Sequence, residues 1–154
     1  MAGSAPKIKI DSSGLAVTIL VTSWHSEITE ALLQGAERAL KESGNEHYTI
    51  IRVPGAFELP LAAKWAAEDE ADAIIALGVV IQGETPHFDY VCDAATQGLT
   101  QVQLEYGIPI GFGLLTVDTP QQALDRAGLP DSKEDKGAEA VEAAIHMARL
   151  RLID

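Results

Sequence analysis

Residues 73–81 read AIIALGVVI, an apolar run that is typical of a strand buried on both faces. Three more runs rich in β-branched and aliphatic residues lie at 15–21, 48–53 and 108–117, and helical patterns follow the runs along the chain. Because buried strands alternate with helices, the sequence predicts a parallel sheet covered on both faces. This fold class is a three-layer α/β/α sandwich with right-handed crossovers.

The starts of the helices can also be predicted. Ser26, Thr85, Thr119 and Ser132 stand where capping side chains are expected, and the helix that follows Thr85 should extend to about residue 106. The last helix should bury a stripe made of Val141, Ala144, Ile145, Ala148 and Leu152.

The length and composition are those of one globular domain. The chain has 154 residues, 47% of them hydrophobic, and a formal net charge of −12. We expect residues 1–14 to form a flexible N-terminal tail, with a short strand-like piece at 7–10, and residues 15–154 to form a single α/β domain. The acid excess argues against nucleic acid and anionic membranes as partners.

Sequence features also predict a cytoplasmic location. The N-terminal residues lack the apolar core of a secretory signal, and no apolar run has the roughly 18 residues of a membrane span. The single cysteine, Cys92, excludes an internal disulfide and suits a reducing compartment. No Lys or Arg lies between Lys64 and Arg126. An anion bound by that region must therefore be held by something other than its own basic side chains.

In parallel sheets, ligands bind beyond the carboxyl ends of the strands. The loops expected at that end are 23–26, 54–58, 82–87 and 117–119. The most distinctive one contains Gly83-Glu84-Thr85, whose backbone N–H groups, together with the start of the next helix, would form an anion site. The alternative is an ordinary strand-to-helix turn with a capping threonine.

Other residues near these loops are candidates for binding or catalysis. His87, in the first turn of the long helix, is a candidate acid or base, the alternative being an exposed histidine without a role. Trp24 and Phe57 would flank a planar ring or fill the core, and His25 would also face the pocket. Glu58 would bind ligand hydroxyls or stabilise a helix start.

We interpret Cys92 as a small core residue because it points away from His87 on the helix. No residue cluster has the spacing of a metal site, so no zinc is expected, and no dinucleotide or P-loop fingerprint is present. The long helix is poor in charge, and its small, neutral face is expected to pack against a neighbouring subunit, unless it is merely a polar surface. The residues of that face are Ala94, Thr96, Gly98, Thr100 and Gln101.

Three segments resemble the 6,7-dimethyl-8-ribityllumazine synthase family, in the same order: PGAFELP at 54–60, GVVIQGETPHFDYVCDAATQGL at 78–99, and DRAG with DKG around 125–137. The resemblance implies a flavodoxin-like sheet with strand order 2-1-3-4. It also implies condensation of 5-amino-6-(D-ribitylamino)uracil with 3,4-dihydroxy-2-butanone 4-phosphate, without cofactor or metal. This reaction is the penultimate step of riboflavin biosynthesis.

The resemblance also implies roles for individual residues. His87 matches the catalytic acid/base, and Trp24 matches the aromatic ring that stacks on the pyrimidine. The residues matched to pyrimidine and ribityl binding are Ala56, Phe57, Glu58, Val79, Val80 and Ile81, together with Phe112 and Lys136 from a neighbouring subunit. The residues matched to phosphate binding are Gly83, Glu84 and Thr85, with Arg126 from the neighbour.

Three positions depart from the family pattern: Trp24-His25 replaces the commoner Phe-Asn, Gln82 replaces a frequent Arg, and Glu84 puts a carboxylate in the phosphate loop. The resemblance implies a homopentamer with active sites between subunits and a functional link to riboflavin synthase. The long stretch from Arg126 to Lys136 predicts a free pentamer instead of a shell. The alternatives are a paralogue that binds a flavin or lumazine without turnover, and an unrelated phosphate-binding domain.

Overall fold

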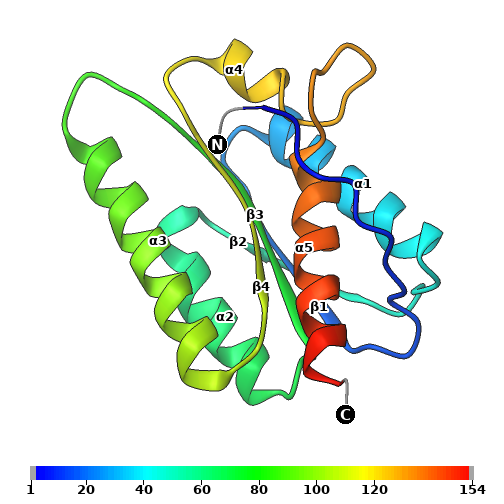
Figure 1. Ribbon diagram of the computed structural model, residues 1–154. Coiled ribbons are helices and arrows are strands. Elements are labelled where there is room, and N and C mark those ends of the chain that lie inside the picture. Colours follow the sequence, from blue (N-terminus) through cyan, green and yellow to red (C-terminus); the bar gives the residue numbers. More distant parts are fainter. Residues whose placement is uncertain (1–2, 153–154) are drawn as a thin grey trace.

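A four-stranded parallel sheet forms the centre of the computed structural model, which describes residues 3–152 (Figure 1). Its strands are β1 (Val17–Thr22), β2 (Thr49–Val53), β3 (Ala73–Ile81) and β4 (Ile110–Val117). All neighbouring pairs are parallel, and the spatial order is β2-β1-β3-β4. The predicted strand order and fold class are therefore confirmed.

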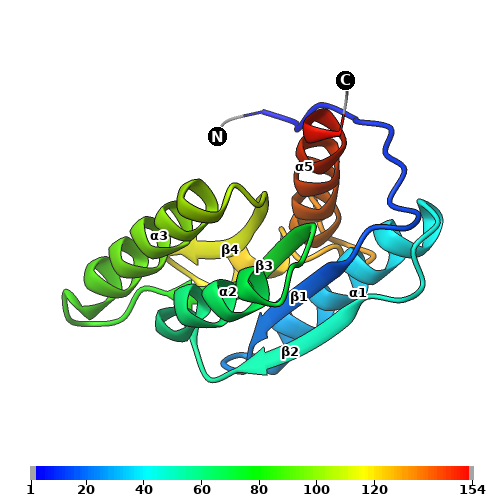
Figure 2. The same cartoon turned by 90° about the horizontal axis from the view of Figure 1, so that it is seen from below.

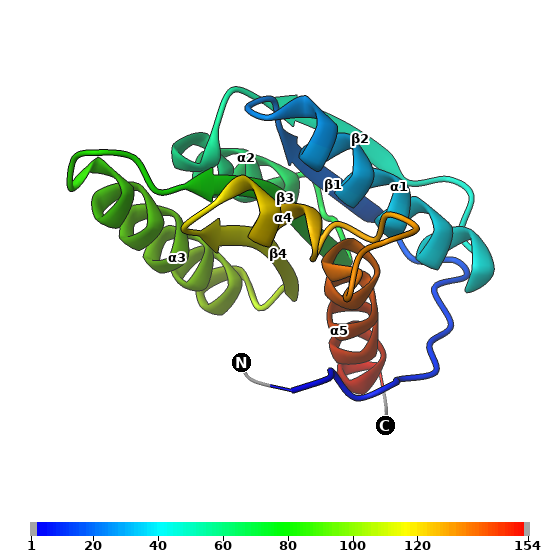
Figure 3. The ribbon, with the colours of Figure 1, turned by 90° about the horizontal axis from the view of Figure 1, so that it is seen from above.

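Helices cover both faces of the sheet (Figures 2 and 3). One face carries α1 (Ser26–Glu42) and α5 (Lys136–Arg151), and the other carries α2 (Leu59–Glu68) and α3 (His87–Tyr106). Two short helices, η1 (Ala56–Glu58) and α4 (Pro120–Leu124), follow the ends of β2 and β4.

Alternating side chains of the central strands supply the two halves of the core. In β3, Ile75 and Leu77 pack with α1 and α5, whereas Ile74 and Ala76 pack with α2 and α3. All four side chains are fully buried. Because both faces of the sheet are covered by helices and need apolar side chains, the sequence of β3 is a continuous apolar run.

The structure corrects three of the predicted caps. His25, not Ser26, is the N-cap of α1, and Pro86 precedes α3 without a side-chain cap. Asp135 caps α5 by accepting a hydrogen bond from the N–H of Ala138, whereas the Ser132 hydroxyl is bonded to Leu124, the last residue of α4, and to Leu129. Only the predicted Thr119 cap is confirmed: its hydroxyl accepts from the Gln122 N–H at 3.3 Å.

Four burial or strand predictions are also wrong. Residues 7–10 form no strand, since none of the sheet strands pairs with them. Leu152 is 60% exposed because α5 has ended at residue 151, although the other four residues of its predicted stripe are buried. Cys92 is only half-buried. Gly98 faces Pro60 of α2, where a Cβ would lie 2.5 Å from Cγ, and therefore does not belong to the exposed face of α3.

Within residues 3–152, no helix combines the length and the apolar character needed to cross a bilayer. The domain boundary at residue 15 and the flexibility of residues 1–14 remain predictions. At the end of that segment, Ser12 is buried and its hydroxyl donates to the carbonyl of Leu40 in α1.

Replacing Gly137 by alanine is expected to destabilise the protein. Helices α1 and α5 approach so closely at this position that a Cβ would overlap the carbonyl oxygen of Leu32. We expect a loss of about 1–3 kcal/mol in the free energy of unfolding, the usual range for overpacking, measured by urea denaturation. Gly83→Ala is the control, because no atom lies within 4 Å of its Cβ position. Equal midpoints for Gly137→Ala and wild type would contradict this packing.

Candidate active site

A cavity of about 630 Å³ lies beyond the carboxyl ends of β1, β2 and β3. This volume is in the range that accommodates small organic ligands. The strand order reverses between β1 and β3, so the cavity occupies the switch point at which α/β sheets usually bind ligands. Its lining residues are Trp24, His25, Gly55, Ala56, Phe57, Glu58, Val79, Val80, Ile81, His87, Tyr90 and Val91.

Two loops that hold aromatic side chains are joined at the base of the cavity. Ser23, after β1, donates from its backbone N–H to the carbonyl of Pro54 at 3.2 Å and from its hydroxyl to that of Val53 at 2.9 Å. The Trp24 indole then lies against Gly55, where a Cβ would be 3.2 Å from Cδ1. Trp24 and Phe57 remain 68% and 65% exposed, so their faces are free to contact a planar ligand.

The Glu58 carboxylate combines a structural contact with a free acceptor. Its Oε2 accepts a hydrogen bond from the Gly55 N–H at 3.0 Å, which fixes the loop between β2 and α2. Among the described residues, Oε1 has no hydrogen-bond partner and remains available to a ligand hydroxyl. Both interpretations of Glu58, helix start and ligand acceptor, are therefore compatible with the geometry.

Strand β3 offers an unpaired edge to the same cavity. Its pairing with β1 ends at Leu77, opposite Val21, whereas its pairing with β4 continues to Ile81, opposite Val117. In residues 78–81, alternate N–H and C=O groups point toward the β1 side, where the described residues provide no strand partner. These backbone groups can form hydrogen bonds with a flat heterocycle.

His87 is the first residue of α3 and lines the cavity, as its proposed role requires. Tyr90 also lines the cavity and is not among the residues predicted from the sequence. Its position three residues after His87 places it on the same face of the helix, and this spacing was the available signal. Cys92 does not line the cavity. Burial, followed by the carboxylates of Asp89 and Asp93, raises the pKa of its thiol, which disfavours a nucleophilic thiolate.

The loop that contains Gly83, Glu84 and Thr85 connects two lining residues, Ile81 and His87, but is not itself part of the cavity wall. It stands away from the other elements at the upper left of Figure 1, and all three residues are exposed. None of their backbone N–H groups donates a hydrogen bond to a described residue. The Thr85 hydroxyl accepts only a long bond, 3.4 Å, from the His87 N–H. The loop therefore presents several free donors.

Neither the backbone angle nor a contact with the described residues requires a glycine at position 83. Its φ angle lies outside the left-handed region, and no atom is within 4 Å of its Cβ position. This contrasts with the glycine at 137, which other backbone atoms crowd. The space beside Gly83 is open, as a site that receives a ligand or another chain would be.

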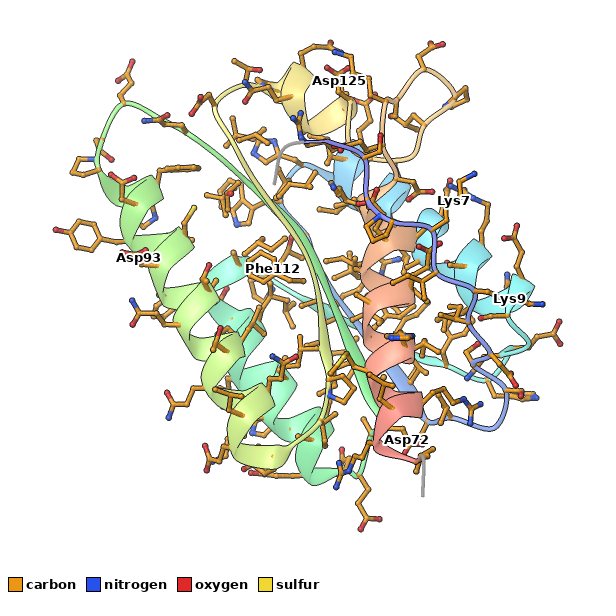
Figure 4. All side chains as sticks on the ribbon, in the orientation of Figure 1. Lys7, Lys9, Asp72, Asp93, Phe112 and Asp125 are labelled. Carbon is orange, nitrogen blue, oxygen red and sulfur yellow. The ribbon has the colours of Figure 1, made fainter. Side chains whose placement is uncertain are left out.

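Besides the loop at 83–85, three more predicted site residues lie outside this cavity. Phe112 is on the edge strand β4 and is 48% exposed (Figure 4). Arg126 and Lys136 lie in and after the loop that follows α4, where each pairs with a different oxygen of Glu134 at 3.5 Å. Lys136 also pairs with Glu139 at 2.6 Å, and this hydrogen bond is the main cause that raises the pKa of its ammonium group. The structure therefore separates the predicted residues into two groups: those that line the cavity or stand in the adjoining loop at 83–85, and those that lie away from it.

The charges within the cavity differ from those of a site that binds phosphate with its own basic side chains. No Lys or Arg is among its lining residues, which include one carboxylate, Glu58, and two imidazoles, His25 and His87. Among residues 3–152, no three His, Cys, Asp or Glu side chains gather as metal ligands would. The cavity can stack and hydrogen-bond a heterocycle, and His87 can transfer protons within it.

Comparisons with known proteins agree with this geometry. Residues 14–151 match the family model described as 6,7-dimethyl-8-ribityllumazine synthase. A protein of that name from Kineococcus radiotolerans is 62% identical over 92% of this chain and 88% of its own length. Proteins of the same name from Clavibacter sepedonicus and Streptomyces coelicolor are 60% and 54% identical, over 95% and 94% of this chain and 92% and 90% of their own lengths. The chain therefore belongs to the 6,7-dimethyl-8-ribityllumazine synthase family.

Proposed function

We propose that this chain catalyses the reaction for which its family is named. 5-Amino-6-(D-ribitylamino)uracil and 3,4-dihydroxy-2-butanone 4-phosphate would be joined to give 6,7-dimethyl-8-ribityllumazine, phosphate and water. The observation that carries the proposal is the cavity itself. It combines exposed aromatic faces, a free carboxylate oxygen, an unpaired strand edge and a histidine beside a loop of free N–H donors.

The pyrimidine would lie across the end of β3. Its carbonyl and N–H groups would form hydrogen bonds with the backbone of Val79, Val80 and Ile81. One face of the ring would stack on Trp24. The ribityl chain would run past the segment Ala56–Glu58, where the Oε1 atom of Glu58 accepts a hydroxyl hydrogen bond. The register of β3 supports this arrangement, because its backbone is unpaired on the β1 side from residue 78 onward.

The phosphate would bind at the loop of Gly83, Glu84 and Thr85. Backbone N–H groups and the positive end of α3 attract an anion without a basic side chain. The Glu84 carboxylate must then point away from the phosphate. Arg126 of a second copy would add the positive charge that the loop lacks, and Phe112 and Lys136 of that copy would close the cavity. The separation of these three residues from the cavity of their own chain supports this arrangement.

The exposed face of α3 is a suitable surface for that second copy. Residues 94–104 contain no charged side chain, although the chain carries a net charge of −12. Thr96, Gln97, Thr100, Gln101 and Leu104 are exposed there. We propose a homopentamer in which each cavity is completed by a neighbour. The proposal includes a cytoplasmic location and a functional link to riboflavin synthase, which would act on the product.

The chemistry requires few catalytic groups. The 5-amino group attacks the ketone and water is lost to give an imine. The phosphate then leaves, the remaining enol tautomerises, and attack of the ribitylamino nitrogen closes the ring with loss of a second water. His87 would move protons in these steps, together with water. Holding both substrates in a reactive orientation contributes up to about 7–11 kcal/mol, so positioning is the larger part of catalysis.

Mixing the two substrates with the protein tests the proposed function. We expect lumazine absorbance and fluorescence to appear faster than in the uncatalysed reaction. His87→Ala should slow turnover by up to about 10²-fold, because water can replace only part of the proton transfer. Its affinity for substrates should change little. A wild-type rate equal to the uncatalysed rate would refute the proposed enzymatic activity. An unchanged rate in His87→Ala would show that His87 has no role in the mechanism.

Gly83→Ala should separate phosphate binding from folding. The methyl group meets no atom of the residues that the structure describes, so the unfolding midpoint should match that of wild type. A bound phosphate would contact the same space, so the KM for the butanone phosphate should rise about tenfold or more, which corresponds to one strong hydrogen bond to a charged group. The KM for the pyrimidine should not change. An unaltered KM for the phosphate substrate would show that this loop does not hold the phosphate.

Sedimentation velocity tests the proposed assembly. We expect one species of five chains and no larger shell, because the stretch from Arg126 to Lys136 projects as a long loop after α4 (Figure 1). A monomer would contradict the shared site. A shell-sized particle would contradict the free pentamer while leaving the shared site intact.

A further inference from the structure

His25 has an unusual backbone for a residue with a side chain. Its φ and ψ angles are 57° and 61°, in the left-handed region, where residues other than glycine are strained. Its carbonyl oxygen accepts hydrogen bonds from the N–H groups of Ile28 and Thr29 at 2.9 and 3.1 Å, which start helix α1. Strained positions of this kind concentrate at functional sites.

Starting the helix does not require this side chain. Thr119 and Asp135 cap α4 and α5 with their side chains, whereas the imidazole of His25 makes no capping bond. It also forms no hydrogen bond with any other described residue, and it is exposed. Serine, threonine, aspartate or asparagine would serve better as an N-cap, so local helix stability does not account for a histidine here.

The imidazole is close to the surface on which the proposed pyrimidine would stack. Its ring centroid lies 6.5 Å from that of Trp24, with an angle of 46° between the ring planes. Both side chains line the cavity. At this distance and tilt the two rings are not stacked face to face. A planar ring that rests on Trp24 would therefore meet His25 at one of its edges.

We propose that His25 is a specificity-determining residue that binds a polar edge of the pyrimidine ring. This inference rests on the proposed function. The unpaired backbone of β3 serves one edge of the ring, and the imidazole, which has one donor and one acceptor nitrogen when neutral, serves another. The loop proposed to hold the phosphate, at residues 83–85, is at the start of α3 on the other side of the cavity. His25 therefore contributes to binding of the pyrimidine and not to binding of the phosphate.

The substrate and the product share this contact. Both contain the same pyrimidinedione, and the new bonds form at the opposite side of the ring. An interaction that is equal in the ground state and the transition state changes KM and leaves kcat unaltered. Loss of the imidazole should therefore weaken the binding of the pyrimidine substrate and of the lumazine product to a similar extent.

His25→Gly is the most informative variant, because glycine adopts the left-handed conformation without strain. We expect the KM for the pyrimidine and the Kd for 6,7-dimethyl-8-ribityllumazine, measured by fluorescence titration, to rise about three- to tenfold, the effect of one hydrogen bond. The KM for the butanone phosphate and kcat should match wild type, and the melting temperature should not fall. His25→Asn, which tolerates this conformation and keeps a polar group, should recover part of the affinity.

Ser26→Ala is the matched control, because Ser26 is the next residue, is exposed and does not line the cavity. It should leave all three binding constants unchanged. Wild-type affinity for the lumazine in both His25 variants would overturn the proposal, as would a rise in the KM for the phosphate substrate alone. Because the titration requires no turnover, it tests His25 even if the wild-type protein proves inactive. Absence of turnover would count against the proposed function alone.

Discussion

Strand β3 continues for four residues beyond its last pairing with β1, and the candidate site depends on this difference in length. The pairing with β4 keeps the extension rigid, while residues 3–152 provide no strand partner for the other edge of its backbone. Loops that follow β1 and β2 then place Trp24 and Glu58 beside the free edge. A heterocycle can therefore be recognised by fixed backbone groups, which need no reorganisation when the ligand binds.

The charge distribution is the reason for proposing that a second chain completes this site. No Lys or Arg occurs between Lys64 and Arg126, and none lines the cavity. Within its own chain, Arg126 shares the carboxylate of Glu134 with Lys136, away from the cavity. A phosphate substrate would thus have free N–H donors at the loop of Gly83 but no cation. A second copy that packs on the uncharged face of α3 would provide the cation and exclude water.

Much of the fold could be predicted from the sequence, because continuous apolar runs such as residues 73–81 have few alternatives to a central parallel strand. Helix starts were less predictable. Ser132 has the chemistry of a cap, but its hydroxyl is used within the loop, and His25 lacks that chemistry yet occupies the position. Trp24, Glu58 and His87 were found because they follow strand ends. The resemblance supplied Phe112 and Arg126. The pattern of one chain can suggest a contact face, as on the long helix, but does not identify the residues that another copy would contribute.

In the proposed assembly each site combines His87 of one copy with Arg126 of another. Its most direct test is to co-assemble His87→Ala and Arg126→Gln chains in equal amounts and to measure lumazine formation. In a ring with random neighbours, about a quarter of the sites would contain both intact residues, so activity should recover to about that fraction of wild type. If both residues act within one chain, no site is intact. The mixed assembly would then show only the average activity of the two separate variants, which would contradict this account.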